Sequence, residues 1–147
     1  MRVLFATDGQ EQSNAAIAVF QYLALKENDE IKVIDVIEVG VPLGVDIYGG
    51  YLPDQQELED KAKGRALSVL DKTAEKIRSV VDNEGVNITT EVLVGKPESK
   101  IVERAEEMSA NLIVVGSHGY KAWERLLLGS VSDAVVHHSP CSVLVVR

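Results

Sequence analysis

Five runs of apolar, largely β-branched residues, separated by segments with helical spacing, constrain the fold of this chain more than any other feature. The runs are Arg2–Thr7, Ile31–Glu38, Asn87–Val94, Leu112–Ser117 and Ser142–Val146. Short apolar runs that alternate with helices are typical of parallel strands buried on both faces. Because crossovers between parallel strands are right-handed, few topologies remain. The pattern predicts an α/β fold: a single open, doubly wound, five-stranded parallel sheet in the order 3-2-1-4-5, with helices on both faces.

Four segments between these runs carry apolar residues at the spacing of an amphipathic helix. The predicted helices cover Ser13–Lys26, about Asp54–Asn83, a segment from Pro97 to Met108, and a segment that opens at Ser130 and stops at Pro140. Ser130 and Asp133 form a capping-box-like pair at the start of the last helix. The segment Val39–Pro53 holds four glycines and two prolines, which predicts a loop within the domain.

Composition bounds the class of protein. The chain has 147 residues, enough for one domain with a sizeable core, so we expect a single domain over residues 1–147. No apolar run approaches the roughly 20 residues of a membrane span. Asp8 comes too early for a secretory signal, and the single Cys141 cannot form an intrachain disulfide, which together favour a cytoplasmic protein. The net charge of −8 argues against a nucleic-acid or anionic-membrane partner, but not against a nucleotide, because a phosphate site is made locally.

The strongest functional motif follows the fourth strand. Gly116-Ser117-His118-Gly119 ends that strand, and Gly129-Ser130 opens a new helix after nine further residues. Bare backbone N–H groups and a helix N-terminus around one point are what a phosphate group needs. We expect the glycines to adopt positive φ and to let a ligand approach the backbone. The Ser130 hydroxyl can donate to a phosphate oxygen, or it can simply cap its helix.

Asp8, directly after the first strand, is the second candidate. In doubly wound sheets ligands bind at the carboxyl ends of the strands where the strand order reverses. If strands one and four flank that point, Asp8 and Gly116 meet there. Asp8 can accept a hydrogen bond from an adenine amino group or a ribose hydroxyl, or it can cap the helix that follows. No partner carboxylate lies near it in the sequence, so we expect no metal site and name no catalytic residue.

These features together resemble the universal stress protein family, in its nucleotide-binding branch. The resemblance rests on Thr7-Asp8-Gly9 with Ser13 after the first strand, on Val36 in the second, and on Gly116-x2-Gly119-x9-Gly129-Ser130 running on to Cys141–Val146. It covers essentially the whole chain. Ala6 departs from the proline of many members. The resemblance implies a small, usually dimeric α/β protein that binds ATP.

Carried over residue by residue, the resemblance implies adenine contacts at Thr7, Asp8 and Val36. It implies ribose and phosphate contacts at Gly116, Ser117, His118, Gly119, Gly129, Ser130, Val131 and Ser132. ATP is the implied ligand, with ADP or AMP as alternatives. Mg²⁺ is expected to arrive with the nucleotide, held by phosphates and water.

The predicted function is a small cytoplasmic stress-response protein that binds ATP at the carboxyl ends of strands one and four. The last strand, Cys141–Val146, is short and apolar, and an exposed edge of that kind favours pairing with a second copy. This agrees with the dimer that the resemblance implies, whose protein partner is unspecified. No Walker motif G-x4-G-K-[ST] is present, so binding with at most slow hydrolysis is favoured. A nucleotide-free interaction module and a true ATP hydrolase remain as alternatives.

Overall fold

The computed structural model describes residues 1–9, 13–38, 55–117 and 128–147. Its strands form one parallel sheet in the order β3-β2-β1-β4-β5, as predicted. The strands are β1 (Arg2–Ala6), β2 (Glu30–Ile37), β3 (Asn87–Val94), β4 (Leu112–Gly116) and β5 (Ser142–Val146). Each predicted strand lies within one residue of the observed bounds, because buried parallel strands leave a long β-branched signature in the sequence.

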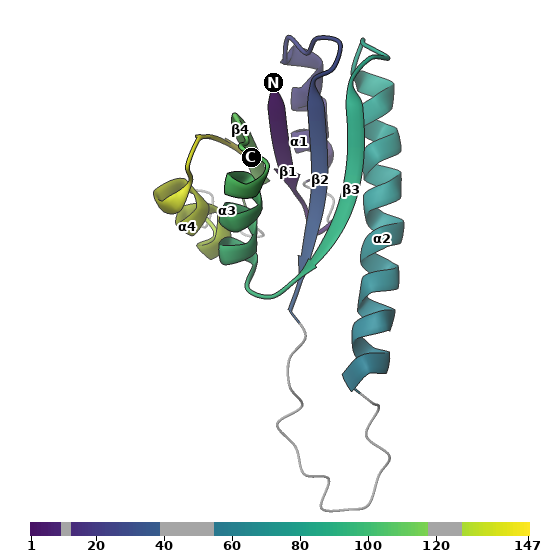
Figure 1. Ribbon diagram of the computed structural model, residues 1–147, viewed down its shortest axis with the longest axis vertical. Coiled ribbons are helices and arrows are strands. Elements are labelled where there is room, and N and C mark those ends of the chain that lie inside the picture. The colour runs from purple at the N-terminus through teal and green to yellow at the C-terminus, as the bar shows by residue number, and fades with distance from the viewer. Residues whose placement is uncertain (10–12, 39–54, 118–127) are drawn as a thin grey trace, which may run out of the picture.

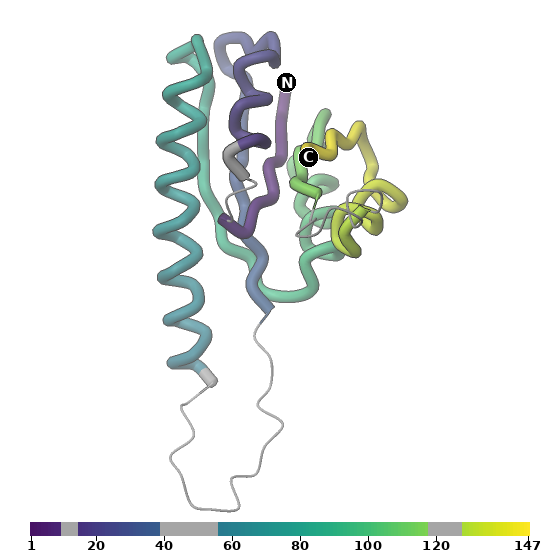
Figure 2. The backbone as a smooth tube through the Cα atoms, turned by 180° about the vertical axis from the view of Figure 1, so that it is seen from behind, coloured from purple at the N-terminus to yellow at the C-terminus, as the bar shows by residue number. Residues whose placement is uncertain are grey.

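Helices cover both faces of this sheet, again as predicted (Figure 1). They are α1 (Ser13–Val19), which continues as the 3-10 turn η1 (Phe20–Tyr22), α2 (Gln55–Val80), α3 (Pro97–Glu107) and α4 (Ser130–His138). The long α2 runs beside β3 and contacts α1, while α3 and α4 pack together on the other face. Figure 2 shows the same two layers from behind. No described helix has the length and apolar character needed to cross a membrane.

Two apolar clusters fill the layers between sheet and helices. Alternate residues of a strand point to opposite faces, so Phe5 packs toward α1 and α2 while Leu4 packs toward α3 and α4. The Phe5 and Phe20 rings meet edge to face with centroids 5.4 Å apart. On the opposite face, Ile101 and Val135 pack in the cluster of Leu4. The cavity described below opens at one end of these layers.

The first helix is shorter than predicted. The apolar spacing predicted a helix over Ser13–Lys26, but α1 ends at Val19, and after η1 the backbone is extended at Leu23. Phe20 is still buried, and Leu23 still packs against the same cluster. A tight turn therefore brings these apolar side chains to the core just as a longer helix would. The predicted loop Val39–Pro53 lies outside the described residues.

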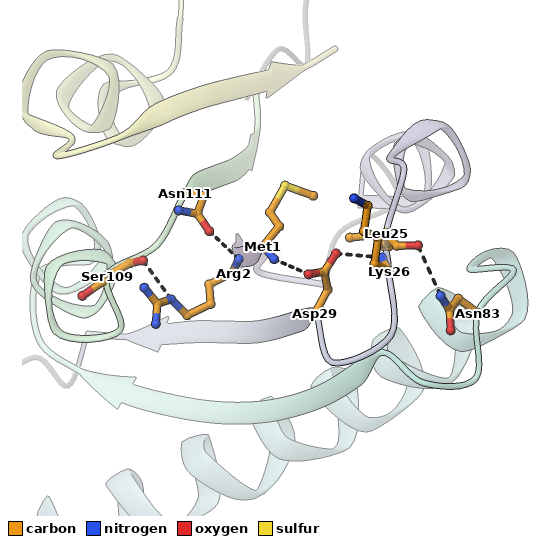
Figure 3. A network of polar contacts seen from close by, with 8 residues as sticks. All are labelled: Met1, Arg2, Leu25, Lys26, Asp29, Asn83, Ser109 and Asn111. Atoms are coloured by element: carbon orange, nitrogen blue, oxygen red, sulfur yellow. Dashed lines mark hydrogen bonds and ion pairs between the residues drawn. The ribbon is translucent and has the colours of Figure 1, made fainter.

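Polar contacts close the amino ends of the strands (Figure 3). The Asp29 side chain, 10% exposed, pairs with the Met1 amino group and accepts the Lys26 backbone N–H at 2.8 Å. The hydrogen bond from the amino group is the main cause that lowers the pKa of Asp29. Nearby, the Arg2 backbone N–H donates to the Asn111 side-chain carbonyl at 2.7 Å. These contacts tie β1, β2 and the turn before β4 together at the end opposite the cavity.

Candidate functional site

A difference in strand length opens the sheet at its carboxyl edge. β1 stops at Ala6, which pairs with Ile34 of β2 and Val115 of β4. The next link is the Thr7 N–H, which donates to the Ile34 carbonyl at 3.0 Å. β2 continues to Ile37 but pairs there with β3. Beyond the end of β1 no described strand separates β2 from β4, and this is also where the strand order reverses, the usual ligand position in such sheets.

A cavity of about 240 Å³ occupies this opening. Its apolar wall comes from the ends of the strands and from α3, and includes Phe5, Ile34, Pro97, Ile101 and Val115. Among the residues predicted to bind a nucleotide, seven line the cavity: Thr7, Asp8, Val36, Gly116, Ser117, Val131 and Ser132. Asp8 and Gly116 therefore meet at one opening, as the strand-order argument required.

The other four predicted residues are not placed on the cavity wall. Gly129 and Ser130 are described but do not line it. His118 and Gly119 lie outside the described residues. Gly129 and Ser130 begin α4, so they lie next to the lining residues Val131 and Ser132 along the chain.

Gly116 contributes space rather than an unusual conformation. Positive φ was expected here and at Gly129, and both expectations are wrong: Gly129 has φ −63°, and the described glycines with positive φ are Gly9 and Gly95. A Cβ added at Gly116 would meet no atom within 4 Å. Because Gly116 lines the cavity, its missing side chain leaves bare backbone facing that space. This arrangement leaves room for a ligand to lie against the end of β4.

The start of α4 also differs from the predicted capping box. Gly129, not Ser130, is the N-cap residue, and it has no side chain to bond the first turn. The pairing of Ser130 with Asp133 is therefore wrong, and Ser130 is exposed. Ser132 is buried, and its hydroxyl donates to the Gly129 carbonyl at 2.9 Å. The first-turn N–H groups have no acceptor within their own helix, which suits an anion at this end.

Asp35 is the residue that the sequence interpretation missed. It lies on the cavity wall with Asp8, and it is half-buried. Burial is the main cause that raises the pKa of Asp35; the charge of Asp8 adds to the rise, and a hydrogen bond from the Val36 N–H opposes it. Asp8 therefore does have a carboxylate neighbour, 27 positions along the chain. The signal in the sequence was a charged residue within the apolar run Val33–Ile37. In the structure this residue follows Ile34, the last residue of β2 that pairs with β1.

The acid pair is not part of a larger ligand set among the described residues. Within them, no group of three or more histidine, cysteine, aspartate or glutamate side chains gathers in a way that could hold a metal ion. Asp8 and Asp35 are also the charged side chains among the described lining residues. The site thus combines an apolar wall, bare backbone at Gly116 and two carboxylates, a mixture that suits an organic ligand with hydrogen-bonding groups.

The sequence matches a known protein family over its whole length. The sequence model of the universal stress protein family matches residues 1–147. Universal stress protein MJ0531 from Methanocaldococcus jannaschii is 32% identical over 146 residues, which cover 99% of this chain and 81% of that protein.

Solved structures also have a fold similar to that of this chain. The protein MJ0577 is similar with a TM-score of 0.77 and 25% identity, over 99% of this chain and 94% of that one. A universal stress protein solved in complex with cAMP is similar with a TM-score of 0.69 and 26% identity, over 100% of this chain and 97% of that one.

Proposed function

Because the chain belongs to the universal stress protein family, we propose that it is a stress-response protein that binds an adenine nucleotide in the cavity between β2 and β4. The observation that carries the proposal is the bare backbone at Gly116, which faces a cavity lined by Thr7, Asp8 and Val36. The cAMP held by a related structure supports the choice of an adenine nucleotide. The proposed binding domain spans residues 1–147.

The size of the cavity suggests how the ligand divides between inside and outside. At about 240 Å³ it falls below the roughly 300 Å³ at the lower end for sites that enclose a whole drug-sized ligand. We therefore place the base and ribose inside, against Val36 and the apolar wall, with Asp8 accepting from an amino or hydroxyl group. The phosphates lie at the rim beside Ser117 and the N-terminus of α4, whose dipole favours an anion.

The residues at this rim have distinct proposed roles. Gly129 and Ser130 offer backbone N–H groups at the start of α4, and His118 and Gly119 complete the phosphate contacts. The Ser132 hydroxyl donates to the Gly129 carbonyl and so holds the first turn of α4 in shape. Ser132 also lies on the cavity wall and keeps its proposed ribose or phosphate contact.

The proposal also covers which nucleotide is bound, whether it is hydrolysed, and whether the protein forms a dimer. We propose ATP as the ligand, in a cytoplasmic setting, with Mg²⁺ held by its phosphates and with slow hydrolysis at most. We also propose a homodimer through β5, since β5 stands at the edge of the sheet and pairs on one side with β4. Light scattering after size-exclusion chromatography tests the dimer, and a monomer at micromolar concentration would contradict it.

The central experiment fills the space at Gly116. We expect calorimetric titration of the wild-type protein with Mg·ATP and with AMP to show saturable heat. Gly116→Val places branched carbons in the cavity, so we expect its nucleotide affinity to fall at least a hundredfold. Its thermal midpoint should change little, because the first added carbon meets no atom.

A control outside the cavity is Gly64→Ala in α2. Gly64 also has open space where a Cβ would stand, but it does not line the cavity. We expect its nucleotide affinity to equal that of the wild type, while alanine stabilises the helix by up to about 1 kcal/mol. Absence of heat and of a thermal shift for the wild type at millimolar nucleotide would overturn the proposed function.

A further inference from the structure

The backbone of β2 faces the cavity at Val36. Earlier in the strand, the Ile34 carbonyl accepts the Thr7 N–H on the β1 side. Later, the Ile37 carbonyl accepts the Gly95 N–H on the β3 side. Successive residues of β2 therefore direct their backbone polar groups to opposite neighbours. Val36 comes two residues after Ile34, so its N–H and carbonyl point to the β1 side, where β1 has ended and the cavity begins.

The Asp35 carboxylate lies at the same edge of β2. It accepts a hydrogen bond from the Val36 N–H, and Asp35 lines the cavity. A carboxylate has about four acceptor positions, so one backbone hydrogen bond leaves others for a ligand. The ionised carboxylate and the Val36 carbonyl are both acceptors. This edge of β2 therefore suits a ligand group that carries hydrogen-bond donors.

Apolar side chains reach the cavity from both layers of the fold. Phe5 and Ala16 belong to the cluster beneath α1 and α2, while Ile34 and Ile101 belong to the cluster beneath α3 and α4. Beyond the end of β1, β2 and β4 are separated by about 10 Å, twice the spacing of neighbouring strands. A flat heteroaromatic ring fits such a gap, with its faces against apolar groups and one edge toward β2.

The anion end of the cavity lies across this gap. The lining residues from the end of β4 and the start of α4 are Gly116, Ser117, Val131 and Ser132. The proposed phosphate rim lies on that side. Because a phosphate and a carboxylate repel each other, a nucleotide lies with its phosphates at α4 and its base toward β2. Asp35 therefore meets the base rather than the phosphates.

We propose that Asp35 is a specificity-determining residue that accepts a hydrogen bond from the 6-amino group of the bound base, so that the cavity selects 6-aminopurine nucleotides over 6-oxopurine nucleotides. This inference rests on the proposed function and specifies how its site reads the base. The amino group has two N–H donors, one for the Asp35 carboxylate and one for the Val36 carbonyl. A 6-oxopurine places an oxygen there instead, which leaves both protein acceptors without a donor.

The test compares AMP with IMP in calorimetric titrations at pH 7. The two nucleotides share their ribose and phosphate, so the ratio of their affinities reports on the base and cancels the general effect of a charge change. We expect the wild type to bind AMP about tenfold or more tighter than IMP. Asp35→Asn supplies an amide that donates to the 6-oxo group. We therefore expect its affinity for IMP to rise and its preference for AMP to fall about tenfold or more.

The matched control is Asp71→Asn, which makes the same change in charge at an exposed position of α2. Its preference for AMP should equal that of the wild type. An equal preference in the wild type and Asp35→Asn, with heat of binding in both, would overturn this inference and leave the proposed function standing. No heat from either nucleotide in any of the proteins would instead overturn the proposed function and this inference with it.

A second measurement needs no variant. Purine riboside 5′-monophosphate carries hydrogen in place of the 6-amino group and is otherwise identical to AMP. We expect the wild type to bind it about tenfold or more weaker than AMP. Equal affinities for the two ligands would overturn the inference even if Asp35→Asn failed to fold.

Discussion

The two ends of the sheet each bury an aspartate, and the two aspartates have opposite surroundings. Asp29, at the amino ends, meets the Met1 amino group and the Lys26 N–H, and its pKa is lowered. Asp35, at the carboxyl ends, meets an apolar wall and Asp8, and its pKa is raised. Asp29 stabilises the fold through its ion pair and hydrogen bond. Asp35 lies beside the cavity in surroundings that disfavour its ionised form. Acids with a shifted pKa in a cleft are typical of functional sites.

The largest expected effect comes from the turn that positions Asp8. Gly9 has φ +74°, and a Cβ there would stand 2.2 Å from Cγ1 of Val69. The left-handed conformation costs a non-glycine residue about 1–2 kcal/mol, and overpacking adds about 1–3 kcal/mol. We expect Gly9→Ala to lower the free energy of unfolding by about 2–5 kcal/mol in urea denaturation. A loss below about 0.5 kcal/mol, no more than an ordinary surface change, would contradict the strained turn.

Asp29→Asn tests the ion pair at the amino ends of the strands. Because the folded pKa of Asp29 is lowered, its stabilisation is present above the unfolded value of 3.8 and is lost as pH falls through the folded pKa. We expect the thermal midpoint of the variant to be several degrees below that of the wild type at pH 7. The two midpoints should converge in strong acid. A constant difference at all pH values would show that the ion pair is not its source.

Asp35→Asn should move stability the other way. Its folded pKa is raised, so the cost of its charge is full above that pKa and disappears below the unfolded value of 3.8. Without nucleotide, we expect the variant to melt slightly above the wild type at pH 7 and at the same temperature in strong acid. Thermal denaturation across this range checks the sign, and a lower midpoint at pH 7 would mean that the ionised acid stabilises the fold.

We expect the smallest change in stability from the loss of an exposed ion pair. This change is the reference against which the effects of the two aspartate variants are judged. Lys61 Nζ lies 2.6 Å from Glu57 on α2, and the two side chains are 61% and 51% exposed. Pairs of this kind contribute at most about 0.5 kcal/mol. We expect Lys61→Gln to change the free energy of unfolding by no more than that in urea denaturation. A larger loss of stability would show that an ion pair in this protein stabilises the fold without burial. The buried surroundings of Asp29 would then not be needed to explain its contribution.

The sequence predicted the sheet better than the helix ends. Buried strands leave continuous apolar runs, and right-handed crossovers then restrict their order. Helix ends leave weaker marks. α1 stops at Val19 although Phe20 and Leu23 keep helical spacing, because a 3-10 turn brings the same side chains to the core. At α4 the sequence offered Ser130 as a cap, yet Gly129 takes that position without a side chain.

The site was predicted where it depends on strand ends and missed where it depends on register. Thr7, Asp8 and Gly116 each follow or end a strand, so their meeting could be inferred from topology alone. Asp35 lies inside β2, and only the pairing of Ala6 with Ile34 shows that β1 has already stopped at that level. A linear sequence does not specify how far one strand runs past its neighbour.

The overhang of β2 past β1 has a consequence for how such proteins diversify. The hollow lies where β1 stops short of β2, and its wall combines the strand ends with Thr7, Asp8 and Ser117 from the segments that follow β1 and β4. Exchange of those segments would change the chemistry of the wall while the strand pairing that makes the space stays the same. Conversely, if β1 paired for two more residues, Thr7 and Asp8 would become part of the sheet and the opening between β2 and β4 would narrow.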